Sequence, residues 1–321
     1  MTPTCPYCSG LLSAVDHNNF CSQKGDVNKW AHGNAFFIRS AHLSSGEHIS
    51  RFTVRAVLSG YQYYNISGRD VILRENNYLI VHDGQKYYTQ IDSFYPTESI
   101  IVAYGWKDIT ETFHTLSARD EDLLDGMPAG SFWEMDWLDS SYEKDFAIRS
   151  LLREFVSAIT RGEKDAMYYE QLRFLLLEKI FYNHVRVLQR AYGLQSRKDT
   201  TRQELLRRLY LAGDYMRAHL EKKLTIAEVS SVVAMSPYHF FRVFKQLFGH
   251  TPLEYLTRER LTHARNLIGK TDLPVSGILQ EVGYDNPSSF SRLFRNYYGY
   301  SPRDIRKNEL QIDSIDREIR G

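Results

Sequence analysis

The chain has 321 residues, about twice the ~150 residues of an average domain, so two or three folded units are expected. Its 43% hydrophobic and 25% charged residues are typical of a globular protein and exclude disordered and collagen-like chains. The formal net charge of +1 argues against a nucleic-acid binder that depends on overall positive charge.

The chain offers no membrane span and no secretory signal. Its aliphatic runs fall far short of the ~18 to 20 residues that a membrane helix needs. The N-terminus lacks the basic and apolar regions of a signal peptide. We therefore expect a soluble, cytoplasmic protein with no membrane partner.

All three cysteines lie within the first 21 residues, which excludes disulfides as the main source of stability. Residues 1–33 contain a candidate zinc site made of Cys5, Cys8, His17 and Cys21, which are ligands of the right type. Two alternatives stay open. In the first, Cys5 and Cys8 form a redox pair, although the surrounding sequence lacks the strand and helix of a thioredoxin fold. In the second, the segment is an unstructured tail with incidental cysteines. No other cofactor is expected.

Residues 35–114 predict a β-rich domain. Short runs of β-branched and aromatic residues are separated by turn signals at intervals of roughly 8 to 12 residues, which is typical of an antiparallel sandwich or barrel. The expected strands cover residues 36–38, 52–58, 61–66, 71–73, 78–81, 87–91 and 99–104.

From about residue 142 the apolar period changes from two to about 3.6, which predicts helices within residues 142–193. The second helix, roughly 166–193, is apolar around much of its circumference. It either packs between the barrel and a neighbouring element or completes a homodimer interface. We assign residues 34–193 to one sensor and dimerisation domain and residues 194–201 to a polar linker.

An internal repeat distinguishes the C-terminal part of the chain. Residues 236–252 are matched fifty positions later by residues 286–302, with Pro, Phe, Arg, Phe, Gly and Pro in register. Upstream, apolar residues of 226–233 match those of 275–282. This pattern predicts a duplicated helix-turn-helix.

Capping signals define the helices of the repeat. Thr225, Thr251 and Ser301 each precede an acidic residue by three positions, as in a capping box. Gly249 and Gly299 suit the left-handed position after a helix. The expected helices are about 202–219, 225–233, 236–248, 252–269, 275–282, 287–298 and 302–307, within a domain of residues 202–308 that is followed by a tail of residues 309–321.

The third and sixth of these helices each have an apolar stripe and an opposite polar face. The stripes are Phe240, Val243, Phe244 and Leu247 in the third helix, and Phe290, Leu293, Phe294 and Tyr297 in the sixth. The opposite faces carry Tyr238, Phe241, Arg242 and Lys245, and Ser288, Ser291, Arg292 and Arg295. Arginine pairs with guanine, hydroxyls adapt to base or phosphate, and phenylalanine covers a thymine methyl. Ordinary amphipathic helices with solvated charges are the alternative, which two copies in tandem and an exposed Phe241 make less attractive.

At these residues the segment from Arg202 to Lys307 resembles the DNA-binding domain of the AraC/XylS family of bacterial transcription regulators. The motifs include Ser236-Pro237-x-x-Phe240-x-Arg242, the bridging Arg260-Leu261-x-x-Ala264, and Val282-Gly283-Tyr284-x-x-Pro287-Ser288. Ser230 and Leu279 depart from the family, which usually has alanine there. The resemblance implies two helix-turn-helix subdomains joined by the helix from Pro252 to Gly269, with the third and sixth helices in successive major grooves about one turn, or ~34 Å, apart.

The resemblance also assigns roles by position. The implied base readers are Tyr238, Phe241, Arg242, Ser288, Ser291 and Arg292. Lys245 and Arg295 are the expected phosphate contacts, together with the capping residues Ser236 and Asn286, because helix N-termini favour phosphate.

The N-terminal half resembles the family's cupin-like sensor domains more loosely, through a barrel followed by two helices. Such domains bind a small effector or dimerise. The His-x-His pair and glutamate of metal-binding cupins are absent, since His48, His82 and His114 are dispersed. Tyr61, Tyr63, Tyr87 and Trp106 form a candidate effector pocket, or are simply core residues.

The sequence thus predicts an α+β protein: a cupin-like β-barrel with two dimerisation helices, then an all-α domain with two helix-turn-helix subdomains. The expected function is a sequence-specific transcription regulator without catalytic activity. It binds double-stranded DNA and, as the family implies, RNA polymerase, a second copy of itself and a small effector, with activation as the family's usual mode. The alternative is a cupin-type small-molecule-binding protein or enzyme with an appended helical recruitment domain.

The uneven distribution of charge along the chain changes the argument from net charge against nucleic-acid binding. Residues 202–308 contain 17 basic and 10 acidic residues, a net charge of +7, whereas the rest of the chain has 23 and 29, a net charge of −6. The near-neutral total is a cancellation, so it does not argue against nucleic acid.

Overall fold

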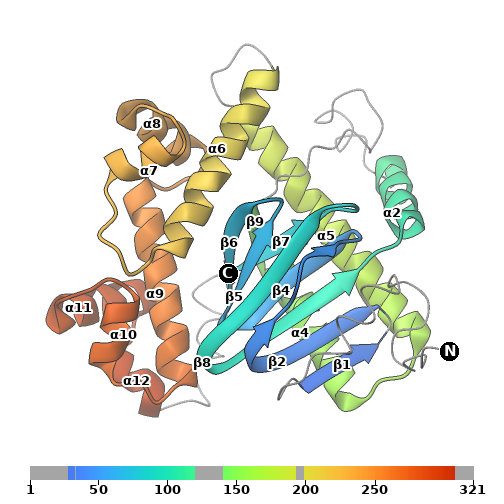
Figure 1. The fold of residues 1–321 in the computed structure, drawn as a ribbon, viewed down its shortest axis with the longest axis horizontal. Coiled ribbons are helices and arrows are strands. Elements are labelled where there is room, and N and C mark those ends of the chain that lie inside the picture. The colour runs from blue at the N-terminus through green and yellow to red at the C-terminus, as the bar shows by residue number, and fades with distance from the viewer. Residues whose placement is uncertain (1–27, 33, 120–139, 193–198, 308–321) are drawn as a thin grey trace. The chain divides into compact units, whose positions relative to one another are not determined.

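The computed structural model describes residues 28–32, 34–119, 140–192 and 199–307 (Figure 1). Contacts divide the chain into two units, Met1–Asp214 and Tyr215–Gly321. This division falls within the helix α6 (Asp199–Ala218), later in the chain than the linker predicted at residues 194–201. Over the described ranges, no helix is long and apolar enough to cross a membrane.

An antiparallel sheet, nearly closed into a barrel, forms most of the first unit. The central strand order is β1-β2-β8-β4-β7-β9, while β5 and β6 branch from β8 and β3 pairs with β8. This confirms the predicted barrel-like β domain; its assignment as a cupin stays a prediction. In the part of the chain that the structure describes, the strands are β1 (Asn28–His32), β2 (Ala35–Ser44), β3 (His48–Ile49), β4 (Thr53–Ser59), β5 (Tyr61–Ile66), β6 (Arg69–Arg74), β7 (Asn77–Val81), β8 (Lys86–Ala103) and β9 (Ser141–Glu143).

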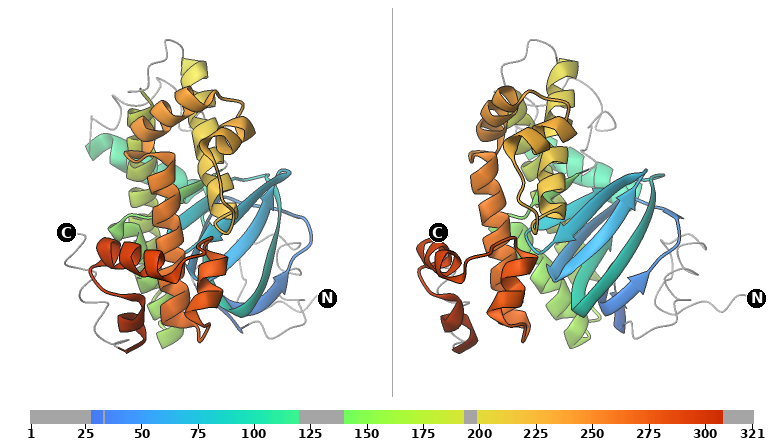
Figure 2. Two further views of the ribbon diagram at one scale, coloured as in Figure 1. Left: turned by 90° about the vertical axis from the view of Figure 1, so that its left-hand side faces the viewer. Right: turned by 60° about the vertical axis from the view of Figure 1, so that its left-hand side comes forward.

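Strand β8 is continuous where the sequence predicted two strands, at residues 87–91 and 99–104. Its pairing with β2 jumps from Asp92 to Thr97, so residues 93–96 leave the regular ladder. Pro96 lies in this excursion, where its missing N–H costs no ladder hydrogen bond. The two halves of β8 then pair with different strands, β5 before the excursion and β4 after it. The strongly curved sheet is visible in Figure 2.

The inner face of the sheet encloses a buried cluster. It consists of Val57, Tyr64, Ile66, Val71, Leu73, Leu79, Val81 and Tyr87. Side chains at alternate positions of the strands point to the other face, which helices α4 (Phe146–Arg161) and α5 (Ala166–Tyr192) cover (Figure 1). On that face the Asn183 side-chain amide of α5 donates to the Tyr78 hydroxyl of β7 at 2.8 Å.

Helix α2 (Trp106–Arg119) was not predicted, because the sequence interpretation extended the β-rich segment to His114. The Gly105 N–H donates to the Asp108 carboxylate at 2.8 Å, which satisfies a free amide at the start of the helix. Ile109, Thr112 and Leu116 are buried at helical spacing. This 3.6-residue period was the signal that the strand assignment missed.

Helix α5 buries apolar residues on several sides within the first unit. The buried residues include Leu172, Leu176, Leu177, Ile180, Phe181, Val185 and Val187. Of the two interpretations left open by the sequence, packing within the same chain accounts for these side chains. A homodimer interface on this helix stays a prediction.

The second unit is helical and its elements confirm the expected ranges to within three residues at each end. After α6 follow α7 (Ile226–Val232), α8 (Pro237–Phe248), α9 (Pro252–Lys270), α10 (Val275–Glu281), α11 (Pro287–Tyr298) and α12 (Pro302–Lys307). Of the three predicted capping boxes, those at Thr225 and Thr251 form in full. At Ser301 one half forms: the Asp304 carboxylate accepts the Ser301 N–H at 2.7 Å. Gly249 and Gly299 end α8 and α11 with φ of 74° and 82°.

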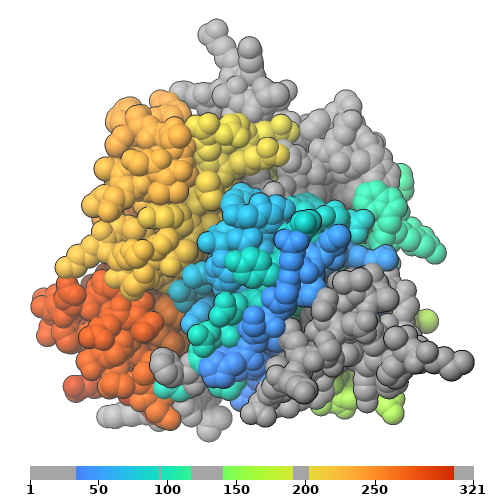
Figure 3. All heavy atoms as spheres, in the orientation of Figure 1, coloured from blue at the N-terminus to red at the C-terminus, as the bar shows by residue number. Residues whose placement is uncertain are grey.

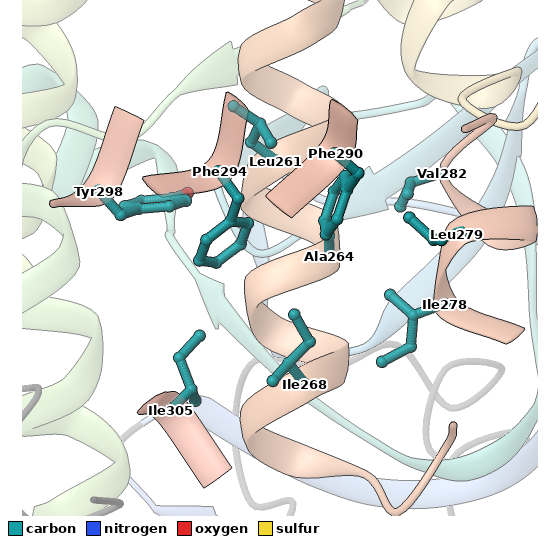
Figure 4. Close-up of a cluster of buried hydrophobic side chains, with 10 residues drawn as sticks. All are labelled: Leu261, Ala264, Ile268, Ile278, Leu279, Val282, Phe290, Phe294, Tyr298 and Ile305. Carbon is teal, nitrogen blue, oxygen red and sulfur yellow. The ribbon is translucent and has the colours of Figure 1, made fainter. Parts of the chain in front are cut away.

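Each half of the repeat has its own core. In the second half, α9, α10, α11 and α12 contribute a cluster of buried side chains around Phe290 and Phe294 (Figure 4). Both departures from the family pattern are accommodated. Leu279 is part of this cluster, and the buried Ser230 satisfies its hydroxyl by donating to the Ala227 carbonyl at 3.0 Å. In the space-filling view, side chains close the gaps between the ribbons of these helices (Figure 3).

Arg260 of α9 joins the two halves of the second unit. Its Nε donates to the Leu220 carbonyl at 2.8 Å, and its Nη2 donates to the Lys222 carbonyl, both in the turn that follows α6. The guanidinium also lies 5.6 Å from the ring centroid of Tyr284, in the turn between α10 and α11. Burial lowers the pKa of Arg260 from its ordinary value, but an arginine remains charged. We call these residues, with Gly283, the Arg260 junction.

Gly283 is required at this junction for two reasons. Its φ of +68° is a left-handed conformation, and a Cβ added to it would lie 2.6 Å from the Leu220 carbonyl oxygen and 2.8 Å from Arg260 Nη2. Gly249 has a similar φ of +74° but open space around it.

The two glycines therefore make a matched pair. We expect Gly249→Ala to cost only the left-handed strain, about 1 kcal/mol. Gly283→Ala also displaces backbone, so we expect a loss of roughly 2 to 4 kcal/mol. Hydrogen exchange of peptides from α9 to α11, measured by mass spectrometry on the full-length chain, compares the two variants. Equal protection in both would contradict the close packing at Gly283.

Candidate nucleic-acid interface

The third helix of the repeat, α8, presents a polar and aromatic face opposite its core. Phe240, Val243, Phe244 and Leu247 are all buried, as predicted. The opposite face exposes the four residues expected there, Tyr238, Phe241, Arg242 and Lys245. Tyr238 is 79% and Phe241 40% exposed, which is a large apolar area to leave in water on a surface helix. The structure thus brings the first set of predicted DNA-contacting residues onto one surface.

The sixth helix, α11, repeats this arrangement. Ser288, Arg292 and Arg295 are exposed, and Ser291 is half-buried beside them. Arg292 and Arg295 are one helical turn apart, so their side chains leave the helix on the same side.

One prediction on α11 was wrong. Tyr297 was expected in the inward stripe, but it is 36% exposed, and Tyr298 is buried in its place. The buried positions of α11 are spaced by four residues, at Phe290, Phe294 and Tyr298. The Tyr297 hydroxyl instead accepts a hydrogen bond from Nε of Arg258 on α9 at 3.3 Å.

The N-termini of α8 and α11 are capped by the residues predicted to contact phosphate. The Ser236 hydroxyl oxygen accepts the His239 N–H at 3.4 Å. The Asn286 side-chain oxygen accepts the N–H groups of Ser288 and Ser289 at 2.9 and 3.1 Å. These amides are therefore engaged by the capping side chains and are not free to bind phosphate. The hydroxyl hydrogen of Ser236 and the amide hydrogens of Asn286 are the donors that these caps retain for phosphate.

Several acidic groups of the second unit are held by hydrogen bonds or an ion pair. The backbone N–H and hydroxyl of Thr225 hold the pKa of Glu228 below its ordinary value, and Thr251 does the same for Glu254. Asp285 pairs with Lys223 at 2.7 Å. The arginine and lysine side chains of α8 and α11 thus stand out as the cationic groups of the two helix faces.

The sequence interpretation included Arg260 in a motif but gave it no role. In the structure it does not lie on either exposed face; it holds the two halves together. No local sequence signal marks this role, because the Leu220 carbonyl that Arg260 contacts lies forty residues earlier in the chain.

The four residues of the candidate effector pocket do not come together. Tyr87 is buried inside the barrel, whereas Tyr61 and Tyr63 are half-buried on the other face of β5 from the buried Tyr64. The Tyr61 hydroxyl donates to the Asp92 carbonyl on that outer face at 2.5 Å. Trp106, at the start of α2, is 56% exposed.

The predicted zinc ligands Cys5, Cys8, His17 and Cys21 lie outside the described residues, so that site stays a prediction. Among the residues that the structure does describe, no three His, Cys, Asp or Glu side chains gather as metal ligands would.

Comparison with known proteins places the C-terminal unit in a family. Residues 229–308 match a family model described as a helix-turn-helix domain. The probable transcriptional regulator LumQ of Photobacterium leiognathi is 40% identical over 94 residues, which are 29% of this chain and 38% of that protein. The arabinose operon regulatory protein of Salmonella typhimurium is 28% identical over 153 residues, 47% of this chain and 51% of that protein.

Among solved structures, the C-terminal domain of AraT, a response regulator from Geobacillus stearothermophilus, has 31% sequence identity and a TM-score of 0.31, covering 32% of this chain and 84% of that one. The two curated relatives are matched over about a third to a half of their own length. The duplicated helix-turn-helix is of the AraC type, and through this domain the chain belongs to the AraC/XylS family of transcription regulators.

Proposed function

We propose that the protein is a sequence-specific DNA-binding transcription regulator whose N-terminal barrel binds a small effector. The observation that carries the proposal is the duplicated reader. Two helices, α8 and α11, each bury an apolar stripe and expose an opposite face with an arginine and further polar or aromatic groups. Two such faces in one folded unit suit two successive major grooves of double-stranded DNA.

The exposed groups divide by chemistry into base readers and phosphate contacts. Arg242 and Arg292 can pair with two acceptors of guanine, Phe241 can cover a thymine methyl, and Tyr238, Ser288 and Ser291 offer hydroxyls. Lys245 and Arg295 lie one turn closer to the C-terminal ends of their helices and pair with phosphate, where a point charge suffices. Ser236 and Asn286 add hydrogen bonds to phosphate from the helix starts.

The regulatory part of the proposal concerns the first unit. In this proposal the barrel binds the effector, helices α4 and α5 join two copies of the chain, and the DNA-bound dimer activates transcription by contacting RNA polymerase. Support comes from the family of the C-terminal unit and from the acidic first part of the chain, which does not compete for DNA.

The alternative function is a small-molecule-binding protein or enzyme of the cupin type that uses the helical unit for recruitment. A barrel lined by histidines and carboxylates would favour it. Beside the aliphatic side chains and tyrosines of its inner cluster, this barrel buries Arg55, Gln62, Asn77 and Ser99. Among the described residues 34–103 no carboxylate is buried with them, which favours the regulator.

Salt dependence tests DNA binding by the full-length protein. If Lys245 and Arg295 alone neutralise two phosphates, the logarithm of the binding constant falls with the logarithm of salt concentration with a slope of about −2 or steeper. Fluorescence anisotropy on a sequence enriched from a random pool measures this slope. Lys107→Ala, which removes an exposed charge from α2, is the control and should leave it unchanged. A flat salt response would sink the DNA-binding assignment.

Substitutions on α8 separate specificity from affinity. We expect Arg242→Ala to relax base preference at one position of the site at a cost of about 1 to 3 kcal/mol. Lys245→Ala, on the same face, should weaken binding to all sequences alike and reduce the salt slope by about 1. Enrichment of binding sites by each variant from one random pool gives both results. Uniform weakening by Arg242→Ala would show that this arginine positions the helix without reading a base.

A further inference from the structure

Buried polar atoms without hydrogen-bond partners gather inside the N-terminal barrel. Among the described residues, those with such atoms in the barrel are Arg55, Gln62, Tyr64, Asn77 and Ser99. They come from four different strands, β4, β5, β7 and β8. In most proteins such atoms are few and scattered.

The strand register places all five side chains on the inner face. Arg55 is paired with Leu79, and Ser99 with Val57, so each lies beside a member of the inner cluster. Gln62 and Tyr64 alternate with half-buried neighbours on β5 and lie on the same face as Ile66. Asn77 lies two positions before Leu79 on β7, which puts it on the same face of that strand.

Arg55 is the charged member of this group. It is 2% exposed. Its Nε donates to the Thr53 hydroxyl at 3.1 Å and its Nη2 donates to the Ser50 hydroxyl at 3.2 Å, while Nη1 has no partner. The guanidinium stacks on the Tyr87 ring, 3.8 Å from its centroid, and lies 5.5 Å from that of Tyr64.

No carboxylate of the described residues pairs with Arg55. The groups that act on it electrostatically are the hydroxyls of Tyr87 and Tyr64. The Tyr64 hydroxyl is near enough to Arg55 and Thr89 to interact with them but makes no well-directed hydrogen bond, and burial raises its pKa to about 12. Tyr64 is therefore neutral at physiological pH, and no carboxylate within the described barrel balances the charge of Arg55.

In another buried arginine of the same unit, carboxylates balance the charge of the guanidinium. Arg173 on α5 is 3% exposed and pairs with two carboxylates, that of Asp108 and, at 2.9 Å, that of Glu170. An unpaired charge in an apolar interior is strongly destabilising, so arginines are buried with acidic partners. Arg55 has the burial of Arg173 without its counter-ions, which is typical of a binding group rather than a structural one.

From this arrangement we propose that the barrel interior binds a small organic carboxylate, held by Nη1 of Arg55. The inference rests on the proposed effector-binding role of the barrel and names the chemical class of the effector. The planar guanidinium matches a carboxylate in geometry and charge. Tyr87, Leu79 and the other members of the inner cluster supply apolar contacts for the body of the ligand.

Asn77 and Ser99 extend the site. Ser99 is paired with Val57, which lies two positions along β4 from Arg55, a separation of roughly 7 Å. A ligand a few atoms long reaches from the guanidinium to the Ser99 hydroxyl. The site therefore selects carboxylates that carry a further oxygen at some distance from the acid group.

The test uses the full-length protein and a panel of carboxylates of two to eight carbons, with and without a hydroxyl or keto oxygen, each compared with its primary amide. Thermal shift and isothermal titration calorimetry measure binding. We expect at least one carboxylate at millimolar concentration to raise the melting temperature while its amide does not. Inorganic phosphate is included, and stabilisation by phosphate alone would overturn the assignment to an organic acid.

Arg55→Gln should abolish the carboxylate shift, whereas Arg51→Gln, the same substitution at an exposed position of the preceding loop, should leave it intact. Arg55→Lys keeps the charge but loses the planar fork, so we expect affinity to fall at least about tenfold with the unliganded melting temperature retained. If Arg55→Gln does not fold, the affinity of Arg55→Lys for the carboxylate tests the proposal instead. Equal affinity in Arg55→Lys and the original protein, or no carboxylate that binds better than its amide, would overturn the proposal.

Specific DNA binding is measured on the same samples. Failure of every carboxylate with intact DNA binding removes the inference and leaves the regulator standing. If the unsubstituted protein does not bind DNA specifically, the proposed function is wrong instead.

Discussion

The hydrogen bonds of Arg260 to the turn after α6 are the interaction on which the C-terminal unit depends. Carbonyls in a turn that is packed against another element need a hydrogen-bond donor, and one guanidinium supplies donors to two of them here. Because the same side chain lies against Tyr284 and because Gly283 admits the close approach, the turn of the second helix-turn-helix is held against the end of the first helix. Helices α8 and α11 thus belong to one packed domain and not to two independent subdomains on a connecting helix.

Local chemistry made the C-terminal unit predictable from sequence. Capping residues, prolines at helix starts and left-handed glycines fix helix ends without help from distant residues, and the two copies of the pattern support one another. Which side chains of these helices face the core was harder to predict. A tyrosine suits both core and surface, so Tyr297 and Tyr298 were distinguishable only by which lay four residues after Phe294 in the packed helix. The role of Arg260 depends on carbonyls forty residues earlier in the chain, and no local pattern reports that contact.

The N-terminal unit was predictable in class but not in detail. Alternation of residue types predicted most strands, yet the continuous β8 depends on partners on both of its sides, and α2 depends on a core that its short sequence does not reveal. Aromatic content alone also misplaced the candidate pocket. Tyr61 and Tyr63 lie on the outer face, and the group that distinguishes the interior is Arg55, a residue type that sequence patterns place at the surface. Strand register decides whether a charged side chain is buried, because a shift of one residue moves that side chain to the other face of the sheet.

The central claim is that α8 and α11 act as one rigid reader, and the spacing of the two half-sites tests it most directly. The full-length protein is bound to its enriched DNA site and to the same site with five base pairs, half a helical turn, inserted between the halves. A reader held by the Arg260 junction cannot follow the rotation, so affinity should fall at least about tenfold, toward that of a single half-site. Unchanged affinity for the lengthened site would show that the two helices bind independently and would contradict the account.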